Sequence, residues 1–245
     1  IVMAFKSMSD SSSFLSLPQE IYTQNFIEVF ESGNIPTALK NTVIVTIFVL
    51  LIEIVAGGLA AYPLSRNKSK WNSRVKGVII GVMMIPSLSI LVGVYSLLVS
   101  IHGISQLWGI ILVSAAFGLP MTIYLFSNFI SAIPSSLDEA SAIDGCGVIK
   151  TFFYIILPQL KPVTVTVIIL NGVSIWNEYA YSLYILQKPK MYTLTLMISQ
   201  YFSTSGKDLN GAAAAACVAI FPLIILYVFL QKYFIQGTID SAVKG

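Results

Sequence analysis

The sequence predicts an all-α, polytopic bundle of membrane-spanning helices, and three observations lead to that fold class. Of its 245 residues, 56% are hydrophobic and only 10% are charged, whereas soluble domains are about 25% charged. Five stretches reach the roughly 20 apolar residues that a helix needs to cross a hydrocarbon core about 30 Å thick. Four of these five contain or border a proline, which membrane helices tolerate where packed neighbours satisfy the freed backbone groups.

The predicted spans divide the chain into an N-terminal segment, residues 1–39, and a transmembrane domain, residues 40–245. The spans cover residues 40–63, 77–99, 108–130, 163–185 and 211–231, with prolines at Pro63, Pro86, Pro120 and Pro222. The opening run Ile1-Val2-Met3-Ala4-Phe5 leads into Lys6 like the end of a helix. We therefore expect one more span before residue 1, giving six spans in the full protein, with residues 6–39 as an external segment.

Charge predicts the orientation of the spans. Residues 65–76 carry five Lys or Arg and no acidic residue, and loops rich in positive charge stay in the cytoplasm. Alternation from this loop places residues 131–162 and the C-terminus in the cytoplasm and the loop 186–210 outside. The sequence thus predicts a multi-pass protein of the cell (plasma or inner) membrane.

The cytoplasmic loop 131–162 is predicted to contain two short helices. Ser136 and Glu139 have the spacing of a capping box, and Gly145 provides a C-terminal stop. Apolar residues then recur at helical spacing over residues 148–157, and Pro158 is predicted to end this second helix. The apolar stripe consists of Val148, Ile149, Phe152, Phe153 and Ile156. The small residues of the first helix, Ala140, Ser141 and Ala142, predict a surface on which a partner docks.

The same loop resembles the signature of permease subunits in bacterial and archaeal ABC importers. That signature is Glu-Ala-Ala, three residues, Gly, nine residues, Ile, one residue, Leu-Pro, and it is matched here from Glu139 to Pro158, with Ser141 in place of the second alanine. The resemblance implies the type I importer permease fold and a loop that docks in a cleft of a partner ATPase. The implied coupling residues are Glu139, Ala140, Ser141, Asp144, Gly145, Ile155, Leu157 and Pro158. An ordinary helix-turn-helix loop is the alternative.

Three further segments resemble the sugar-type, maltose-like branch of that family. They are Ala4-Phe5-Lys6-Ser7, Trp176-Asn177-Glu178-Tyr179 and the C-terminal tail, residues 231–245. The resemblance implies import of a sugar or oligosaccharide, with a polyol or a glycerol-phosphate-type solute as the alternative. It also implies a homologous second permease forming a heterodimer, a cytoplasmic ATPase dimer and an extracytoplasmic sugar-binding protein as partners.

Two groups of residues are candidates for contact with substrate or binding protein. By resemblance, the external loop touches the binding protein, through Lys188, Tyr192, Tyr201 and Phe202, with Lys190 and Lys207 nearby. Trp176, Asn177, Glu178 and Tyr179 combine aromatic and hydrogen-bonding groups, as a sugar path would, or they form a buried network between helices. Glu53 lies inside the first span and is either a path residue or a helix–helix hydrogen bond.

The sequence also excludes several functions. It has no G-x-x-x-x-G-K-[ST], G-x-S-x-G or H-E-x-x-H motif, so we expect no enzyme activity and no cofactor on this chain, with ATP and Mg on the partner ATPase. One histidine, His102, and two separated cysteines, Cys146 and Cys217, offer no metal site. A net charge of +3 without an aromatic-basic groove excludes nucleic acid. A secondary transporter or a membrane-embedded enzyme remains as an alternative class.

Overall fold

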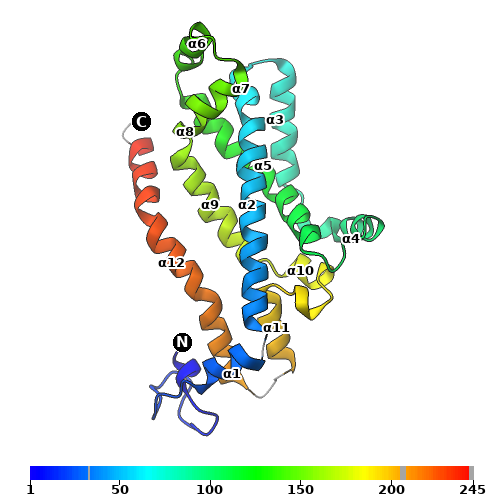
Figure 1. Ribbon diagram of the computed structural model, residues 1–245, viewed down its shortest axis with the longest axis vertical. Coiled ribbons are helices and arrows are strands. Elements are labelled where there is room, and N and C mark those ends of the chain that lie inside the picture. Colours follow the sequence, from blue (N-terminus) through cyan, green and yellow to red (C-terminus); the bar gives the residue numbers. More distant parts are fainter. Residues whose placement is uncertain (33, 205–207, 243–245) are drawn as a thin grey trace. The chain divides into compact units, whose positions relative to one another are not determined.

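The computed structural model describes residues 1–32, 34–204 and 208–242 of the chain, shown in Figure 1. The side chains of Ser32, of residues 201–204, of residue 230 and of residues 232–242 lie outside this description. Every regular element of the described chain is helical, which confirms the predicted all-α class.

The elements follow one another as short and long helices. They are η1 (Val2–Phe5), α1 (Gln24–Ser32), α2 (Ile35–Arg66), α3 (Lys70–Met83), η2 (Ser87–Ile90), α4 (Leu91–Ser100), α5 (Leu107–Ala132), α6 (Ser136–Ile143), α7 (Val148–Thr151), η3 (Phe152–Ile156), α8 (Leu157–Gln159), α9 (Lys161–Trp176), α10 (Ala180–Ile185), η4 (Pro189–Met191), α11 (Leu194–Thr204) and α12 (Leu209–Ala242). Of these, η3 is a π-helix and the other η elements are 3-10 helices.

Three described helices are long and apolar enough to cross a membrane as single pieces: α2, α5 and α12 over Leu209–Phe229. They match three of the five predicted spans. The other two predicted spans, 77–99 and 163–185, do not form single helices in the structure. The span 77–99 is interrupted between Met83 and Ser87 with a bend of 91°, because Pro86 lacks the amide that would continue the helix.

The helix predicted over residues 163–185 ends at Trp176. The apolar segment that would complete a span with it precedes it in the chain instead of following it. Residues 148–159 and α9 pass the length and hydropathy test together, with a bend of 73° between them. Pro162 accounts for this bend, because its ring would clash with the carbonyl four residues earlier in a continuous helix. Counting each bent pair as one span gives up to five spans.

The chain folds into two compact units, each made of segments distant in sequence. Unit 1 comprises Ile1–Thr46, Gly93–Ile110 and Trp176–Val228, and unit 2 comprises Ile47–Val92, Ile111–Ile175 and the end of α12 from Phe229.

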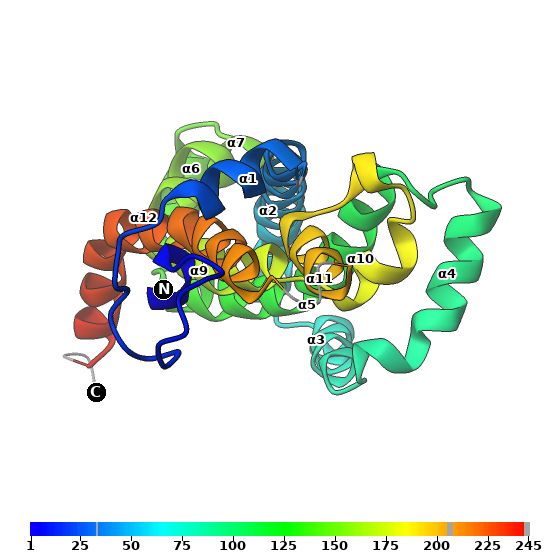
Figure 2. The same cartoon turned by 90° about the horizontal axis from the view of Figure 1, so that it is seen from below.

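The core of unit 1 joins η1, α1 and the start of α2 to α11 and the start of α12. Its buried members are Ala4, Val29, Ile35, Ala38, Trp176, Leu194, Met197, Ala214 and Ala215. The alanines of α12 let neighbouring backbones approach closely, as small residues do in membrane bundles. Figure 2, a view from below, shows α10 and α11 side by side in this unit.

Polar side chains hold the N-terminal segment of unit 1 in place. Asn25 donates from its side-chain amide to the carbonyls of Ala4 and Lys6, at 2.9 and 2.8 Å. The ammonium of Lys6 is buried and donates to the Ser12 hydroxyl, the Ser13 carbonyl and the Ser16 hydroxyl. Burial of this charge is therefore compensated by three oxygen partners.

The core of unit 2 brings α2 and α5 together with η3 and α9. Its buried members are Ala61, Tyr62, Phe126, Ile130, Phe152, Ile156, Leu160, Val163 and Val167. In this unit, α6 and α7 lie at the end of α2 where α3 begins, at the top of Figure 1. The basic segment and the predicted cytoplasmic loop are thus at the same end of unit 2.

Candidate functional site

The sequence signature from Glu139 to Pro158 folds as a helical hairpin, residues 136–159, in which α6 is followed by the continuous run α7, η3 and α8. A hydrogen bond of 2.8 Å between the hydroxyls of Ser141 and Thr151 joins the two arms. Both of these side chains are buried. Ser141 was predicted to lie on the docking surface, but its hydroxyl instead faces the second arm.

The first helix begins one residue earlier than a capping box at Ser136 requires. Its N-cap is Ser135, whose side chain accepts no backbone amide and lies 3.4 Å from Glu139 Oε1. Ser135 has helical dihedrals, φ −67° and ψ −19°, whereas a capping side chain requires an extended N-cap residue. The predicted capping box was therefore wrong.

The end of the first helix agrees with the prediction. Gly145 has a φ of +77°, in the left-handed region that favours glycine. Its amide donates to Ala142 O at 3.1 Å, and the amide of Cys146 donates to Ser141 O at 2.9 Å. These two bonds form a Schellman motif, which turns the chain sharply between the two arms, with Asp144 as the C-cap residue.

The second arm continues past Pro158 to Gln159, so Pro158 does not end it. The preceding residues, 152–156, form a π-helix, a wider turn that relieves the clash of a proline ring with the backbone before it. The predicted apolar stripe is divided: Phe152 and Ile156 are buried in the core of unit 2, while Val148 and Ile149 are exposed. Of the predicted coupling residues here, Ile155 and Leu157 are half-buried and Pro158 is exposed.

The tip of the hairpin presents large apolar side chains to the outside. Ile143, Val148, Ile149 and Tyr154 are exposed by 86%, 71%, 72% and 77%. Ile143, Val148 and Ile149 flank the turn, whereas Tyr154 lies further along the second arm; residues 142–145 and 147–150 are all exposed. Glu139 and Ala140 are also exposed. Such a cluster at the end of a folded hairpin is typical of a surface that another protein covers.

A polar cluster that sequence reasoning missed fixes the hairpin to unit 2. The guanidinium of Arg66 forms an ion pair of 2.7 Å with Asp138 on α6 and donates to the carbonyls of Ile130 and Ile133, at 3.2 and 2.8 Å. The hydroxyl of Tyr62 donates to the same carboxylate at 2.5 Å. Arg66 stood among the charges used to predict orientation, and nothing in the sequence distinguished it from the other four.

The proposed path residues lie where α9 stops and α10 begins. Trp176 is buried, donates from its indole nitrogen to Ala219 O at 3.1 Å, and its carbonyl accepts from the Thr195 hydroxyl. The carboxylate of Glu178 accepts the amides of Tyr181 and Ser182, at 2.6 and 2.9 Å, and the Ser182 hydroxyl at 2.6 Å. Trp176 therefore ties the end of α9 to α12, whereas Glu178 caps the first turn of α10.

The other two members of this group are more accessible. Asn177 and Tyr179 are exposed, and the Tyr179 hydroxyl accepts from Ser199 at 3.1 Å. The structure thus separates the four residues into a structural pair, Trp176 and Glu178, and an exposed pair that remains a candidate for contact with substrate.

The predicted external loop is anchored to the start of α2 by two side chains that sequence reasoning also missed. Asn41 donates to the carbonyls of Lys190 and Tyr192, both at 3.0 Å, and the hydroxyl of Thr42 accepts the amide of Leu194 at 2.7 Å. Lys188 is exposed and Tyr192 is half-buried. Lys207 and the side chains of Tyr201 and Phe202 lie outside the described residues.

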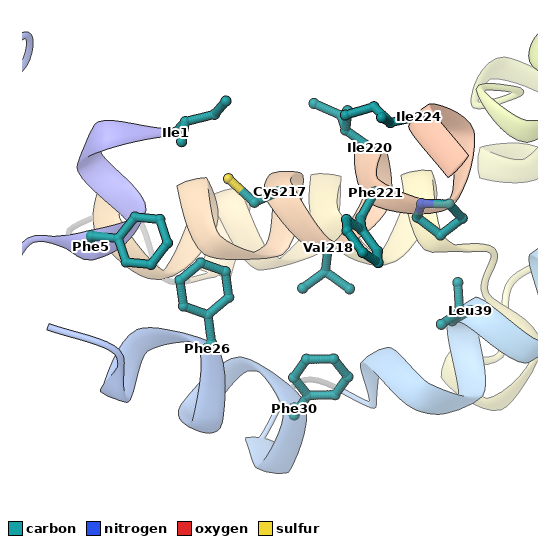
Figure 3. A pocket seen from close by; sticks show the side chains of 11 residues that line it. Ile1, Phe5, Phe26, Phe30, Leu39, Cys217, Val218, Ile220, Phe221 and Ile224 are labelled. Carbon is teal, nitrogen blue, oxygen red and sulfur yellow. The ribbon is translucent and has the colours of Figure 1, made fainter. Parts of the chain in front are cut away.

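Unit 1 contains an apolar cavity of about 510 Å³, shown in Figure 3. It is lined by Ile1, Phe5, Phe26, Phe30, Leu39, Cys217, Val218, Ile220, Phe221, Pro222 and Ile224. None of these side chains provides a strong hydrogen-bonding group for a sugar hydroxyl, so the cavity is a poor candidate for the substrate site.

A second cavity, of about 390 Å³, lies in unit 2 beside the break between α3 and η2. It is lined by Val82, Met83, Ile85, Ser87, Ile90, Ala116, Phe117 and Pro120. Broken membrane helices that line a cavity are where many transporters place their substrate. Within the described residues, no group of three or more potential metal ligands is found in either unit.

Comparison with known proteins agrees with this architecture. Residues 53–240 match the family model "Binding-protein-dependent transport system inner membrane component". In fold, the chain is similar to a bacterial ABC transporter involved in the import of the acidic polysaccharide alginate, with a TM-score of 0.81 and 22% identity, over 95% of this chain and 88% of that chain.

Curated relatives are similar over the whole chain. The melibiose/raffinose/stachyose import permease protein MelC of Bacillus subtilis is 39% identical over 100% of this chain and 89% of its own length. The probable starch degradation products transport system permease protein AmyC of Thermoanaerobacterium thermosulfurigenes is 31% identical over the same shares. Together with the family match, these relatives show that the chain belongs to the family of inner membrane components of binding-protein-dependent transport systems.

Proposed function

We propose that this chain is a permease subunit of an ATP-driven importer, and that its helical hairpin docks on a separate ATPase. The observation that carries the docking site is the exposure of Ile143, Val148 and Ile149 at the tip of the hairpin. Apolar residues in this position gain free energy when a partner covers them, by about 25 cal/mol for each Å² of apolar surface removed from water. The chain itself has no phosphate-binding loop motif, so ATP and Mg bind the partner.

The anchoring of the hairpin supports its role in transmitting movement. Arg66 links α6 to α2 through Asp138 and to the end of α5 through the carbonyls of Ile130 and Ile133. Phe152 and Ile156 bury the second arm in the core of unit 2. A displacement of the hairpin by the ATPase therefore reaches α2, α5 and α9 through packed side chains and hydrogen bonds.

Transport follows from this connection by alternating access. Two homologous permeases enclose the path, and closure of the ATPase dimer around ATP moves their hairpins together, which rocks the helices between inward-facing and outward-facing states. ATP and the loaded binding protein must each favour one state over the other, because a ligand with equal affinity for both shifts no equilibrium. The cavity beside Met83 and Ser87 is a candidate for part of the path.

An experiment on the docking surface tests the proposal. Ile149→Asp places a charge on the exposed tip, and Leu17→Asp makes the same kind of change at an 81% exposed residue of the N-terminal segment. The ATPase should co-purify with the Leu17→Asp permease at the unsubstituted level and be lost from the Ile149→Asp permease. Equal co-purification with both variants would contradict docking at the hairpin.

The hairpin is proposed to lie in the cytoplasm, together with the C-terminus, because the basic segment that begins at Arg66 lies at the same end of unit 2. In a Cys217→Ala background, Cys146 beside the hairpin turn should react with a membrane-impermeant maleimide in inside-out vesicles only. Leu15→Cys, placed at a 91% exposed residue of the N-terminal segment in a cysteine-free background, should react in right-side-out vesicles only. The reverse labelling pattern would show that the hairpin lies outside the cell and would contradict the proposed orientation.

The substrate is proposed to be an oligosaccharide, delivered by an extracytoplasmic binding protein. The relatives whose names state a substrate support this class, since one imports melibiose, raffinose and stachyose and another starch degradation products. Cells carrying the whole system should take up labelled raffinose in competition with stachyose. Uptake of glycerol phosphate without uptake of either sugar would favour the polyol-type alternative.

A further inference from the structure

The core of unit 2 contains a closed triangle of polar side chains. Glu53 on α2 has no exposed surface, and its Oε2 accepts the side-chain amide of Asn171 on α9 at 2.6 Å. Thr122 on α5 donates to the same oxygen at 3.5 Å and accepts from Asn171 at 3.0 Å. One polar group from each of the three helices therefore meets the other two.

Two glycines shape the backbone around this triangle. A Cβ atom at Gly118 on α5 would lie 1.8 Å from Glu53 Oε1, and a Cβ atom at Gly57 on α2 would lie 2.6 Å from Thr122 Cγ2. Gly118 of α5 thus makes room for Glu53 of α2, and Gly57 of α2 makes room for Thr122 of α5. Neither site would accept even an alanine without displacing the polar group.

The triangle is closed to substrate. Glu53 and Thr122 are both 0% exposed, and Asn171 is buried. A buried polar group in a membrane helix costs free energy unless it is paired, so the three side chains stabilise one another instead of lining a path. The choice between a path residue and a contact between helices is therefore decided by burial.

The triangle is connected to the helical hairpin on two sides. Phe152 of the hairpin packs against Gly58 of α2, within 3.2 Å of the position of a Cβ atom there, and its ring centroid lies 5.6 Å from that of Tyr62. On the other side, α9 follows the hairpin directly after the break at Leu160 and carries Asn171 about two-thirds of the way along its length. The hairpin is also joined to α5 through residues 133–135 and linked to α2 by the ion pair of Arg66 and Asp138, so all three helices are attached to it at this end of unit 2.

We propose that Glu53, Asn171 and Thr122 form a polar clamp that keeps α2, α5 and α9 together beyond the hairpin, so that the three helices move as one body when the ATPase moves it. The three are positioning residues for transport, and this role rests on the function proposed above. Without the clamp, the three helices follow the hairpin only at their attached ends and separate further along. ATP is then hydrolysed with little movement of substrate.

The test uses the whole transporter, with both permeases, the ATPase and the binding protein, in proteoliposomes. Glu53→Ala with Gly118→Ala removes the carboxylate and places a methyl group in part of the space that it occupied, so that the cavity is reduced while the clamp is lost. The amount of substrate transported per ATP hydrolysed should fall about tenfold, as expected from the loss of interhelical polar contacts of about 1.4 kcal/mol. Glu53→Gln keeps an oxygen acceptor for Asn171 and should restore the ratio to within about twofold.

Two further variants keep the proposal testable if the double variant does not assemble. Thr122→Val preserves shape and removes one corner of the triangle, and it should lower the ratio with the ATPase still bound. Gly81→Ala on α3 is the control, since no atom lies within 4 Å of its added methyl group. An unchanged ratio in Thr122→Val would overturn the clamp, whereas an ATPase that fails to bind the unsubstituted permease would overturn the proposed function.

Discussion

The guanidinium of Arg66 lies 2.7 Å from the carboxylate of Asp138, which joins the last residue of α2 to the first turn of α6. The two side chains are only 19% and 21% exposed, so water screens the pair less than it screens a surface salt bridge. The same carboxylate accepts the hydroxyl of Tyr62. This arrangement fixes the first helix of the hairpin to the end of α2.

Asp138→Asn should keep the hydrogen bond from Tyr62 and remove the ion pair with Arg66. Because the arginine then loses its charged partner in a mostly buried site, we expect a loss of about 1–3 kcal/mol. Thermal unfolding of the purified permease would measure it. Arg74→Ala, at an exposed residue of α3, is the control and should change stability by less than about 0.5 kcal/mol. Equal losses of stability in the two variants would show that the ion pair of Arg66 and Asp138 contributes no more than an exposed side chain does.

Gly145→Val should distort the turn of the hairpin. The cost comes from the backbone alone, about 1–2 kcal/mol, because Gly145 has a φ of +77° and nothing lies within 4 Å of an added Cβ atom. We expect ATP hydrolysis to continue while uptake is lost, with membrane insertion unchanged. Transport and ATPase assays on the same proteoliposomes measure both.

Gly147→Val is the matched control for this turn. It also has open space around an added Cβ atom, but its φ is −75° and its ψ is 162°, which any residue adopts. Uptake by the Gly147→Val transporter should stay near the unsubstituted level. Normal uptake in both glycine variants would mean that the turn plays no part in coupling.

Glu178→Ala should free the first turn of α10. The carboxylate accepts two backbone amides there, and loss of a helix cap costs about 1 kcal/mol. Hydrogen exchange at the amides of Tyr181 and Ser182 should accelerate about fivefold. The order of preference among sugars should not change in the assembled transporter. A changed order would restore Glu178 as a substrate residue.

Asn41→Leu should release the external loop from α2. Two carbonyls, those of Lys190 and Tyr192, lose their donor, and the loss of a hydrogen bond costs about 0.5–1.5 kcal/mol. Stimulation of ATP hydrolysis by the loaded binding protein should decrease, because that loop is proposed to contact it. Hydrogen exchange over residues 190–194 gives an independent measurement.

Thr46→Val, one turn further along the same helix, is the control for the loop. Its buried hydroxyl has no hydrogen-bond partner among the described residues, so its removal should be neutral or slightly stabilising. Thr46→Val would be as harmful as Asn41→Leu only if any change in this part of α2 disturbed the transporter. An equal decrease in the stimulation of ATP hydrolysis would therefore contradict the anchoring role of Asn41.

Local signals in the sequence predicted most of the helices correctly. Long apolar runs predicted α2, α5 and α12, and Gly145 predicted the end of α6, because hydropathy and a left-handed turn depend only on neighbouring residues. The breaks near Pro86 and Pro162 were harder to predict. A proline inside an apolar run either kinks a helix slightly or ends it, and the surrounding packing determines which.

The sequence by itself determined that this protein crosses a membrane, that its loop 131–162 carries the Glu139 to Pro158 signature, and that it has no phosphate-binding motif of its own. These follow from composition and spacing, which do not depend on distant residues. Only the tertiary structure decided which polar side chains work together. The sequence separation is 72 positions between Arg66 and Asp138. It is 118 positions between Glu53 and Asn171 and 69 between Glu53 and Thr122. Their partners are chosen by how the helices pack, and no local pattern records that packing.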